Sequence, residues 1–296
     1  MTDLPPLDAA SGAIAQRIRF VVKPASGATA LRTFTDPYGR SAVAEDLAAE
    51  RLLEATRREP PAADEFYFLF LPSGAATAIE WQRAAEEWMN GPSPPAERPA
   101  GDPSTGDLPT IDFVAQSDRI LWRPGRAVLV GGAKRLEETR AGLIDFSFHE
   151  GELRKLEGEL EADWPRAESD ALPAHDVDRR ALDRCGHVGE MSQRMALRRI
   201  RLARLAPRLE KASLSLAGSA RRLVGELALH ADVVDRLKHV DDRLEVFEDL
   251  YELANDRLAE FRCFRLEYRL EAWIIAILVI EVAVMFFEIW WTWWLD

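Results

Sequence analysis

Residues 272–295 read AWIIAILVIEVAVMFFEIWWTWWL, a stretch of 24 residues in which only Glu281, Glu288 and Thr292 are polar. At about 1.5 Å per residue, a helix of this length reaches roughly 36 Å, whereas the hydrocarbon core of a bilayer is about 30 Å thick. The stretch contains twelve Ile, Leu, Val and Phe residues. Together they favour insertion by about 4 to 7 kcal/mol, of which a charge near the centre takes back about 3 kcal/mol. We therefore predict a transmembrane helix; a buried core helix of a soluble protein is the alternative.

Tryptophans mark both ends of this predicted span. One stands at its beginning and four stand near its end: Trp273, Trp290, Trp291, Trp293 and Trp294. Tryptophan rings gather at the two interfaces between a membrane and water. This arrangement supports a span over the buried alternative.

The flanking charges predict the orientation of the span. Arg257, Arg262, Arg265 and Arg269 precede it, whereas only Asp296 follows it. The positive-inside rule then keeps the bulk of the protein in the cytoplasm, or in the matrix if the protein is mitochondrial. The chain has only two asparagines among its 296 residues, a bias that suggests a GC-rich bacterial genome. We expect a single-pass C-terminal anchor in a bacterial inner membrane.

Glu281 and Glu288 are seven residues apart, so they share one face of the predicted span. An acid inside a membrane is expensive and commonly functional. The alternative is a contact between helices of a homo-oligomer. Both interpretations stay open, and we group these acids with the five tryptophans as predicted membrane or oligomer contacts.

The first 133 residues alternate between strand-like and helix-like runs. Runs rich in β-branched and aromatic residues predict strands at 18–22, 65–71, 110–116, 119–123 and 127–130. Runs rich in Ala, Leu and Glu predict helices at 42–58 and 75–89. Residues 91–109 include six prolines and predict a flexible loop. We expect a small mixed α/β domain over residues 1–133 with this loop inside it.

From residue 134 to residue 271 the sequence predicts helices. One series of apolar residues keeps heptad-like spacing: Val188, Met191, Met195, Leu202, Leu205, Leu209, Ala212, Leu216 and Leu223. A second series does the same: Leu237, Val240, Leu244, Phe247, Tyr251, Ala254, Leu258 and Phe261. Such spacing predicts a coiled-coil-like hairpin, kinked at Pro207 and turning near Asp232. The fold class is therefore α+β, with a small α/β domain, a long helical hairpin and one C-terminal transmembrane helix.

The densest basic stretch of the chain lies on the first helix of this hairpin. Its members are Arg194, Arg198, Arg199, Arg201, Arg204 and Arg208. A net charge of −12 and a pI near 5.1 argue against nucleic-acid binding by the chain as a whole. We expect ion pairs with acids of the second helix, at Asp249, Glu252, Asp256 and Glu260. Binding of RNA, ribosomes or anionic lipid is the alternative.

Motifs for catalysis or metal binding are incomplete. His149-Glu-Gly-Glu152 begins like a zinc-protease signature but lacks the second histidine. Gly131-Gly132 follows a predicted strand without a phosphate-loop or dinucleotide pattern. The two cysteines, Cys185 and Cys263, have no zinc spacing with any histidine, and we expect both to be buried. We predict no catalytic residue, cofactor or metal.

The end of the chain resembles the "required for meiotic nuclear division" family, which carries the YagE-type domain of unknown function. Members close with Leu-Glu-Trp, an Ile- and Leu-rich run and Ile-Glu. Here Leu270-Glu271, Trp273-Ile-Ile275 and Leu278-Val-Ile-Glu-Val282 are similar to that ending, with Glu271 and Glu281 ten residues apart. Arg243–Leu250 and Gly125–Gly131 are similar to further segments, although members carry tryptophan where Gly131 stands. The resemblance implies a membrane-anchored, non-enzymatic helical protein.

We expect this protein to be a non-enzymatic scaffold or tether that is anchored in the bilayer and homo-oligomeric. In this hypothesis the α/β domain binds a protein partner, and the hairpin acts as a spacer for this domain or brings several copies of the chain together. An alternative is a membrane-associated enzyme or small-ligand sensor with its site in the α/β domain. A third interpretation is an RNA or ribosome tether that uses the arginines from Arg194 to Arg208.

Overall fold

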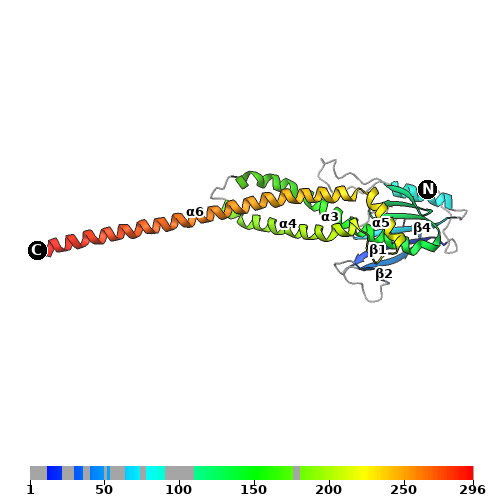
Figure 1. Ribbon diagram of the computed structural model, residues 1–296, viewed down its shortest axis with the longest axis horizontal. Coiled ribbons are helices and arrows are strands. Elements are labelled where there is room, and N and C mark those ends of the chain that lie inside the picture. Colours follow the sequence, from blue (N-terminus) through cyan, green and yellow to red (C-terminus); the bar gives the residue numbers. More distant parts are fainter. Residues whose placement is uncertain are drawn as a thin grey trace. The chain divides into compact units, whose positions relative to one another are not determined.

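The computed structural model describes residues 12–21, 30–35, 41–49, 52–53, 64–73, 78–90, 110–175 and 181–295 (Figure 1). Its strands are β1 (Ile14–Val21), β2 (Ala30–Thr35), β3 (Ser41–Leu47), β4 (Glu65–Pro72), β5 (Ile111–Ala115), β6 (Asp118–Arg123) and β7 (Arg126–Gly131). Its helices are α2 (Ala78–Asn90), the short 3₁₀ helix η3 (Ala133–Arg135), α3 (Leu136–His175), α4 (Ala181–Glu210), α5 (Gly218–His230) and α6 (Val233–Leu295). The predicted α+β class is confirmed, with a long apolar helix at its end.

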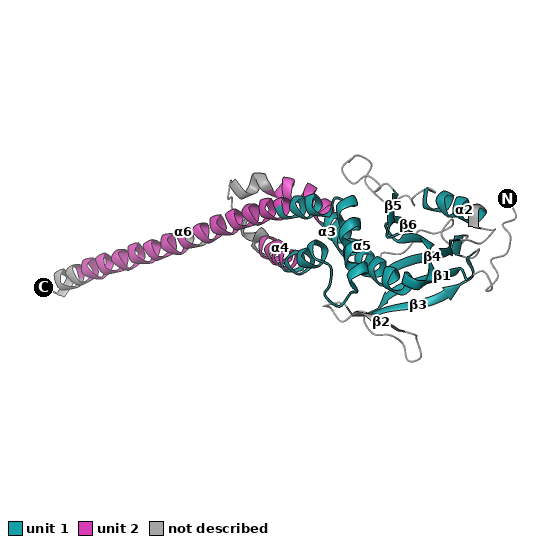
Figure 2. Ribbon diagram, turned by 45° about the vertical axis from the view of Figure 1, so that its right-hand side comes forward, with its two compact units in different colours: residues 1–159, 200–241 teal, residues 160–199, 242–296 magenta. Residues whose placement is uncertain are grey.

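The chain forms two compact units (Figure 2). The first, here called the sheet unit, comprises Met1–Glu159 and Ile200–Asp241. The second, the helical unit, comprises Leu160–Arg199 and Asp242–Asp296. All seven strands belong to the sheet unit, and the described elements of the helical unit are all helical. The predicted domain boundary at residue 133 stays a prediction.

The seven strands form one sheet in the order β2-β3-β1-β4-β7-β6-β5. Strands β4 and β7 pair in parallel, and every other neighbouring pair is antiparallel. The central strand β4 has an apolar or aromatic residue at every position from Phe66 to Leu71, and all six of these residues are buried. A strand buried on both faces needs apolar residues at every position, which explains this run.

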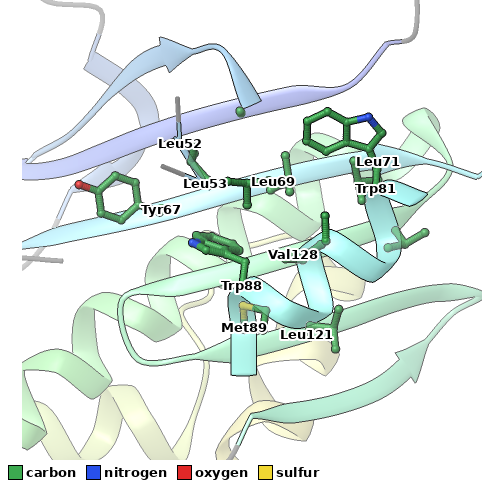
Figure 3. Packing of buried hydrophobic residues seen from close by; sticks show 14 residues of the cluster. Leu52, Leu53, Tyr67, Leu69, Leu71, Trp81, Trp88, Met89, Leu121 and Val128 are labelled. Carbon is green, nitrogen blue, oxygen red and sulfur yellow. The ribbon is translucent and has the colours of Figure 1, made fainter. Parts of the chain in front are cut away.

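One face of the sheet is covered by α2 (Figure 3). Tyr67, Leu69 and Leu71 alternate along β4 and therefore point to the same face. They join a buried cluster that includes Trp81 and Trp88 of α2 (Figure 3). This cluster is one core of the sheet unit.

The first part of α3 packs against the aromatic residues of the other face. The rings of Phe20 and Phe148 lie 4.9 Å apart, and those of Trp122 and Phe146 lie 5.1 Å apart. The indole Nε1 of Trp122 donates a hydrogen bond to Oγ of Ser147 at 2.9 Å, which satisfies its polar atom in a buried position. The sheet is thus packed on both faces.

Three side chains satisfy the carbonyl groups at the end of α2. Arg126 donates to the carbonyl oxygen of Trp88 at 3.0 Å, and Arg123 donates to that of Met89 at 3.0 Å. Thr110 donates to the same oxygen of Met89 at 3.2 Å. The last carbonyl groups of a helix lack partners within the helix, and cationic donors suit the negative end of its dipole.

Most predicted elements of the sheet unit are confirmed, but one is wrong. The strands predicted near β1, β4, β5, β6 and β7 and the helix predicted at 75–89 are present. The helix predicted at 42–58 is wrong at its start, because Ser41–Leu47 is strand β3. This strand pairs with both β1 and β2, and such pairing overrides the helical preference of Ala and Glu. The loop predicted at 91–109 lies outside the described residues.

The heptad residues are buried, although their first helix is interrupted. Every member of the first apolar series except Ala212 is buried, as is every member of the second except Phe261. The segment predicted as one helix from 188 to 223 is divided between α4 and α5 by residues 211–217. The turn predicted near Asp232 is confirmed: α5 ends at His230, Asp232 has a φ of 49°, and α6 begins at Val233.

Candidate membrane-anchor segment and the ion pairs of the helices

The last part of α6 is not covered by any other described part of the chain. Leu258 is the last buried residue of this helix among those described. From Cys263 to Phe287 every described side chain is exposed, and Ile274, Val279 and Phe286 have exposed fractions of 58%, 62% and 67%. Within the described residues, this is the one helix long and apolar enough to cross a membrane.

Such a surface is unfavourable in water. Burying a large apolar side chain stabilises a protein by about 1.5 to 3 kcal/mol relative to leaving that side chain exposed to water. A core helix of a soluble protein would gain this energy from neighbouring residues, but none of the most apolar 18-residue window of α6 is buried inside the protein. The chemistry of the segment therefore matches a hydrocarbon environment.

The structure places part of the predicted membrane contact set. Trp273 and Trp290 are exposed by 69% and 56%, and the ring of Trp290 lies 6.2 Å from that of Phe287. Glu281 is exposed on the same helix and makes no ion pair with any described residue. The helical backbone continues to Leu295. The side chains of Glu288, Trp291, Trp293 and Trp294 lie outside those that the structure describes.

In the helical unit, the predicted basic stretch is engaged in ion pairs. Arg198 of α4 is buried and lies 2.7 Å from Asp163 of α3. Arg199 of α4 donates to Oε2 of Glu248 on α6 from two nitrogens, at 2.9 and 3.2 Å. Arg194 pairs with Glu190 of its own helix at 2.7 Å.

In the sheet unit, Arg201 donates to both carboxylate oxygens of Glu159 on α3, at 2.8 and 2.9 Å. Arg204 and Arg208 are exposed, and neither makes an ion pair within the described part of the chain. The described partners of the stretch are therefore mainly acids of α3, with Glu248 on α6. The partners that we predicted on α6 are wrong: Glu260 instead pairs with Arg257 of its own helix, at 3.2 Å.

A buried ion-pair cluster in the sheet unit was missed from the sequence. Arg236 of α6 donates to both oxygens of Glu157 at 2.8 Å and to Glu150 at 3.1 Å. Glu150 is only 1% exposed and also accepts from Arg154 at 2.9 Å. Burial alone would lower the pKa of Arg236, but the hydrogen bond to Glu157 and the charge of Glu150 outweigh it and raise that pKa.

Asp145 and His149 lie near this cluster on the same helix. The pKa of Asp145 is raised by burial, which the charges of His149 and Arg208 only partly offset. Nδ1 of His149 contacts the carbonyl oxygen of Asp145 at 2.8 Å, and its buried Nε2 has no hydrogen-bond partner among the described residues. Among the described residues, no group of three His, Cys, Asp or Glu side chains has the geometry to hold a metal ion.

A second polar contact joins three helices within the helical unit. Asp170 of α3 accepts from the hydroxyl of Tyr251 on α6 at 3.1 Å and lies 2.9 Å from Nε2 of His187 on α4. Burial and the charge of Asp170 raise the pKa of Tyr251. Glu161 of α3 also accepts from Arg243 of α6. Most of the acids in these contacts therefore belong to α3, and the regular spacing of Glu150, Glu157 and Glu161 was the available sequence signal.

The glycine pair after β7 has a packing role. A Cβ on Gly131 would lie 2.2 Å from Oδ1 of Asp118, whereas one on Gly132 would meet nothing within 4 Å. The same Oδ1 accepts a hydrogen bond from the backbone N–H of Gly132 at 3.1 Å. A buried carboxylate thus occupies the space beside Gly131, and a phosphate group would be repelled there.

Cys263 is exposed, which corrects the prediction that it is buried. The side chain of Cys185 lies outside those described. No protein-family model and no curated protein matches this chain. The family resemblance of its C-terminal residues stays a prediction.

Proposed function

We propose that this chain is a non-enzymatic scaffold or tether that the end of α6 anchors in a lipid bilayer. One observation carries the proposal: the described side chains in the apolar part of α6 are exposed, and no other described part of the chain covers them. The arginines before Trp273 support a cytoplasmic location of the sheet unit under the positive-inside rule. A bacterial inner membrane is the membrane that we propose.

We propose a non-enzymatic role because charged side chains are used in ion pairs between helices. The arginines Arg198, Arg199, Arg201 and Arg236 are engaged with acids of neighbouring helices. Groups held in such pairs position helices and are poorly placed to move protons. The sheet unit is then free to bind a partner through its surface.

Membrane partitioning of two versions of the protein tests the proposal. We compare the full chain with a version that ends at Glu271, which removes the predicted span but keeps the buried part of α6. Membranes are washed with alkaline carbonate, which strips peripheral proteins. Circular dichroism of the truncated version shows whether it is folded.

We expect the full chain to stay in the membrane pellet and the truncated version to be soluble and folded. Release of the full chain by carbonate would contradict the proposal and mark the segment as a packing or oligomerisation helix. If the truncated version also stays in the pellet, the anchor lies elsewhere in the chain.

A further inference from the structure

One stripe of exposed apolar side chains runs along the uncovered part of α6. Its members are Phe264, Tyr268, Ile275, Leu278, Val282 and Met285, each between 49% and 74% exposed. They follow a and d positions of a heptad repeat, in which Glu271 fills the one missing place. The stripe begins six residues after Leu258, the last buried residue of the helix.

Acids follow one edge of this stripe. Glu267 and Glu281 directly precede two of its a positions, Tyr268 and Val282, and therefore occupy g positions. Glu260 occupies the g position one heptad earlier, before Phe261. Arg265 occupies an e position on the other edge. In a parallel pair of helices, a g residue of one helix lies opposite the e residue five positions further along the other. The g position of Glu260 in one copy then faces the e position of Arg265 in a second copy, so Glu260, which pairs with Arg257 within its own chain, gains a second cation.

We infer that two copies of this chain pair in parallel along this stripe, from the segment before the membrane into the bilayer. The inference rests on the proposed membrane anchor. Anchoring from the same side makes two α6 helices parallel and places identical stripes at the same height. A second copy of this chain therefore matches the stripe in length, register and charge.

Pairing resolves two unfavourable exposures at once. Phe264 and Tyr268 precede the span and therefore lie outside the hydrocarbon. In the pair, each of these aromatic side chains is covered by the same residue of the second copy. Glu281 lies beside the seam, where a neighbouring helix shields it from lipid and can accept its hydrogen bond when it is protonated. Glu271, the one acid in the stripe, lies next to the start of the span, at the level where water solvates it.

Cysteine cross-linking in native membranes tests this pairing. The background is the full chain with Cys185→Ser and Cys263→Ser, which removes the two natural thiols. Phe264→Cys and Tyr268→Cys lie on the stripe. Leu266→Cys and Leu270→Cys are matched controls on other faces of the same segment, because their side chains are also exposed, by 60% and 64%. Dimers formed with a mild oxidant are measured on non-reducing gels.

We expect about tenfold more disulfide-linked dimer from the two stripe positions than from the two controls, because a disulfide needs Cβ atoms about 4 Å apart. Equal cross-linking at all four positions, or none, would overturn the pairing, as would a cross-linked product containing another protein. The same membranes are washed with carbonate. If cross-linking is negative and the variants stay in the pellet, the pairing is wrong and the proposed anchor stands. If the variants wash off, the proposed anchor is wrong as well.

Discussion

Replacing Arg236 by methionine should destabilise the sheet unit strongly. Its side chain is 17% exposed and lies between the carboxylates of Glu150 and Glu157, which are 2% and 18% exposed. Methionine keeps the apolar stem but removes the charge, so two carboxylates stay buried with only Arg154 nearby, at 2.9 Å from Glu150. Removing one partner of a buried ion pair costs about 3 to 5 kcal/mol. We expect a loss of that size in the free energy of unfolding.

Urea unfolding followed by circular dichroism measures this loss. The matched control is Arg257→Met, on the same helix, whose ion pair with Glu260 is 3.2 Å long and has exposed fractions of 51% and 59%. Exposed pairs contribute about 0 to 1 kcal/mol, so the control should change little. Adding Glu157→Gln to the Arg236 variant should restore part of the loss. If the two arginine variants differ by less than about 1 kcal/mol, the cluster does not stabilise the fold as argued.

Three further changes give separate tests. Gly131→Ala should lower the free energy of unfolding by about 1 to 3 kcal/mol, because its Cβ would overlap Asp118. The control Gly132→Ala should change this free energy little, and equal effects of the two changes in thermal or urea unfolding would contradict this packing. Asp145→Asn should raise the stability near neutral pH, because the pKa of Asp145 is raised in the folded protein and its ionised form is disfavoured there. The gain should shrink as the pH falls through the raised pKa of Asp145 toward the ordinary value of an aspartate, and it should be absent below that value; a gain that grows as the pH falls would contradict this sign. Glu281→Leu should increase the ratio of inserted to non-inserted protein by roughly tenfold or more in a translocon insertion assay, and an unchanged ratio would show that Glu281 does not oppose insertion of the single helix.

Much of the sheet could be predicted because its strands carry strong local patterns. The run from Phe66 to Leu71 is apolar at every position, which only a strand buried on both faces requires. Strand β3 could not be predicted, because its sequence SAVAEDL favours a helix locally. Its pairing with β1 and β2 depends on residues far away in the chain, and single-sequence patterns carry no record of such pairing.

The buried faces of α4 and α6 could also be predicted, since heptad spacing identifies them directly. The acids that pair with the arginines could not be predicted, because the sequence did not indicate which helices α3 packs against. Its residues include Gly151, Gly158 and Pro165, which all lower helix propensity, and they obscure the pattern. The acids that meet Arg198, Arg201 and Arg236 all lie on this helix, so a two-helix hairpin led to the wrong partners.

The contact between Thr110 and Met89 has a consequence for how this chain tolerates change. A hydrogen bond of 3.2 Å joins Thr110 and Met89, which lie on the two sides of residues 91–109, so the two ends of this connection are held close together. The entropic cost of closing a connection grows only with the logarithm of its length, by about 0.6 kcal/mol for each doubling. Insertions here, including a whole reporter domain with adjacent termini, are therefore compatible with the sheet. This connection is therefore a position at which a label can be introduced.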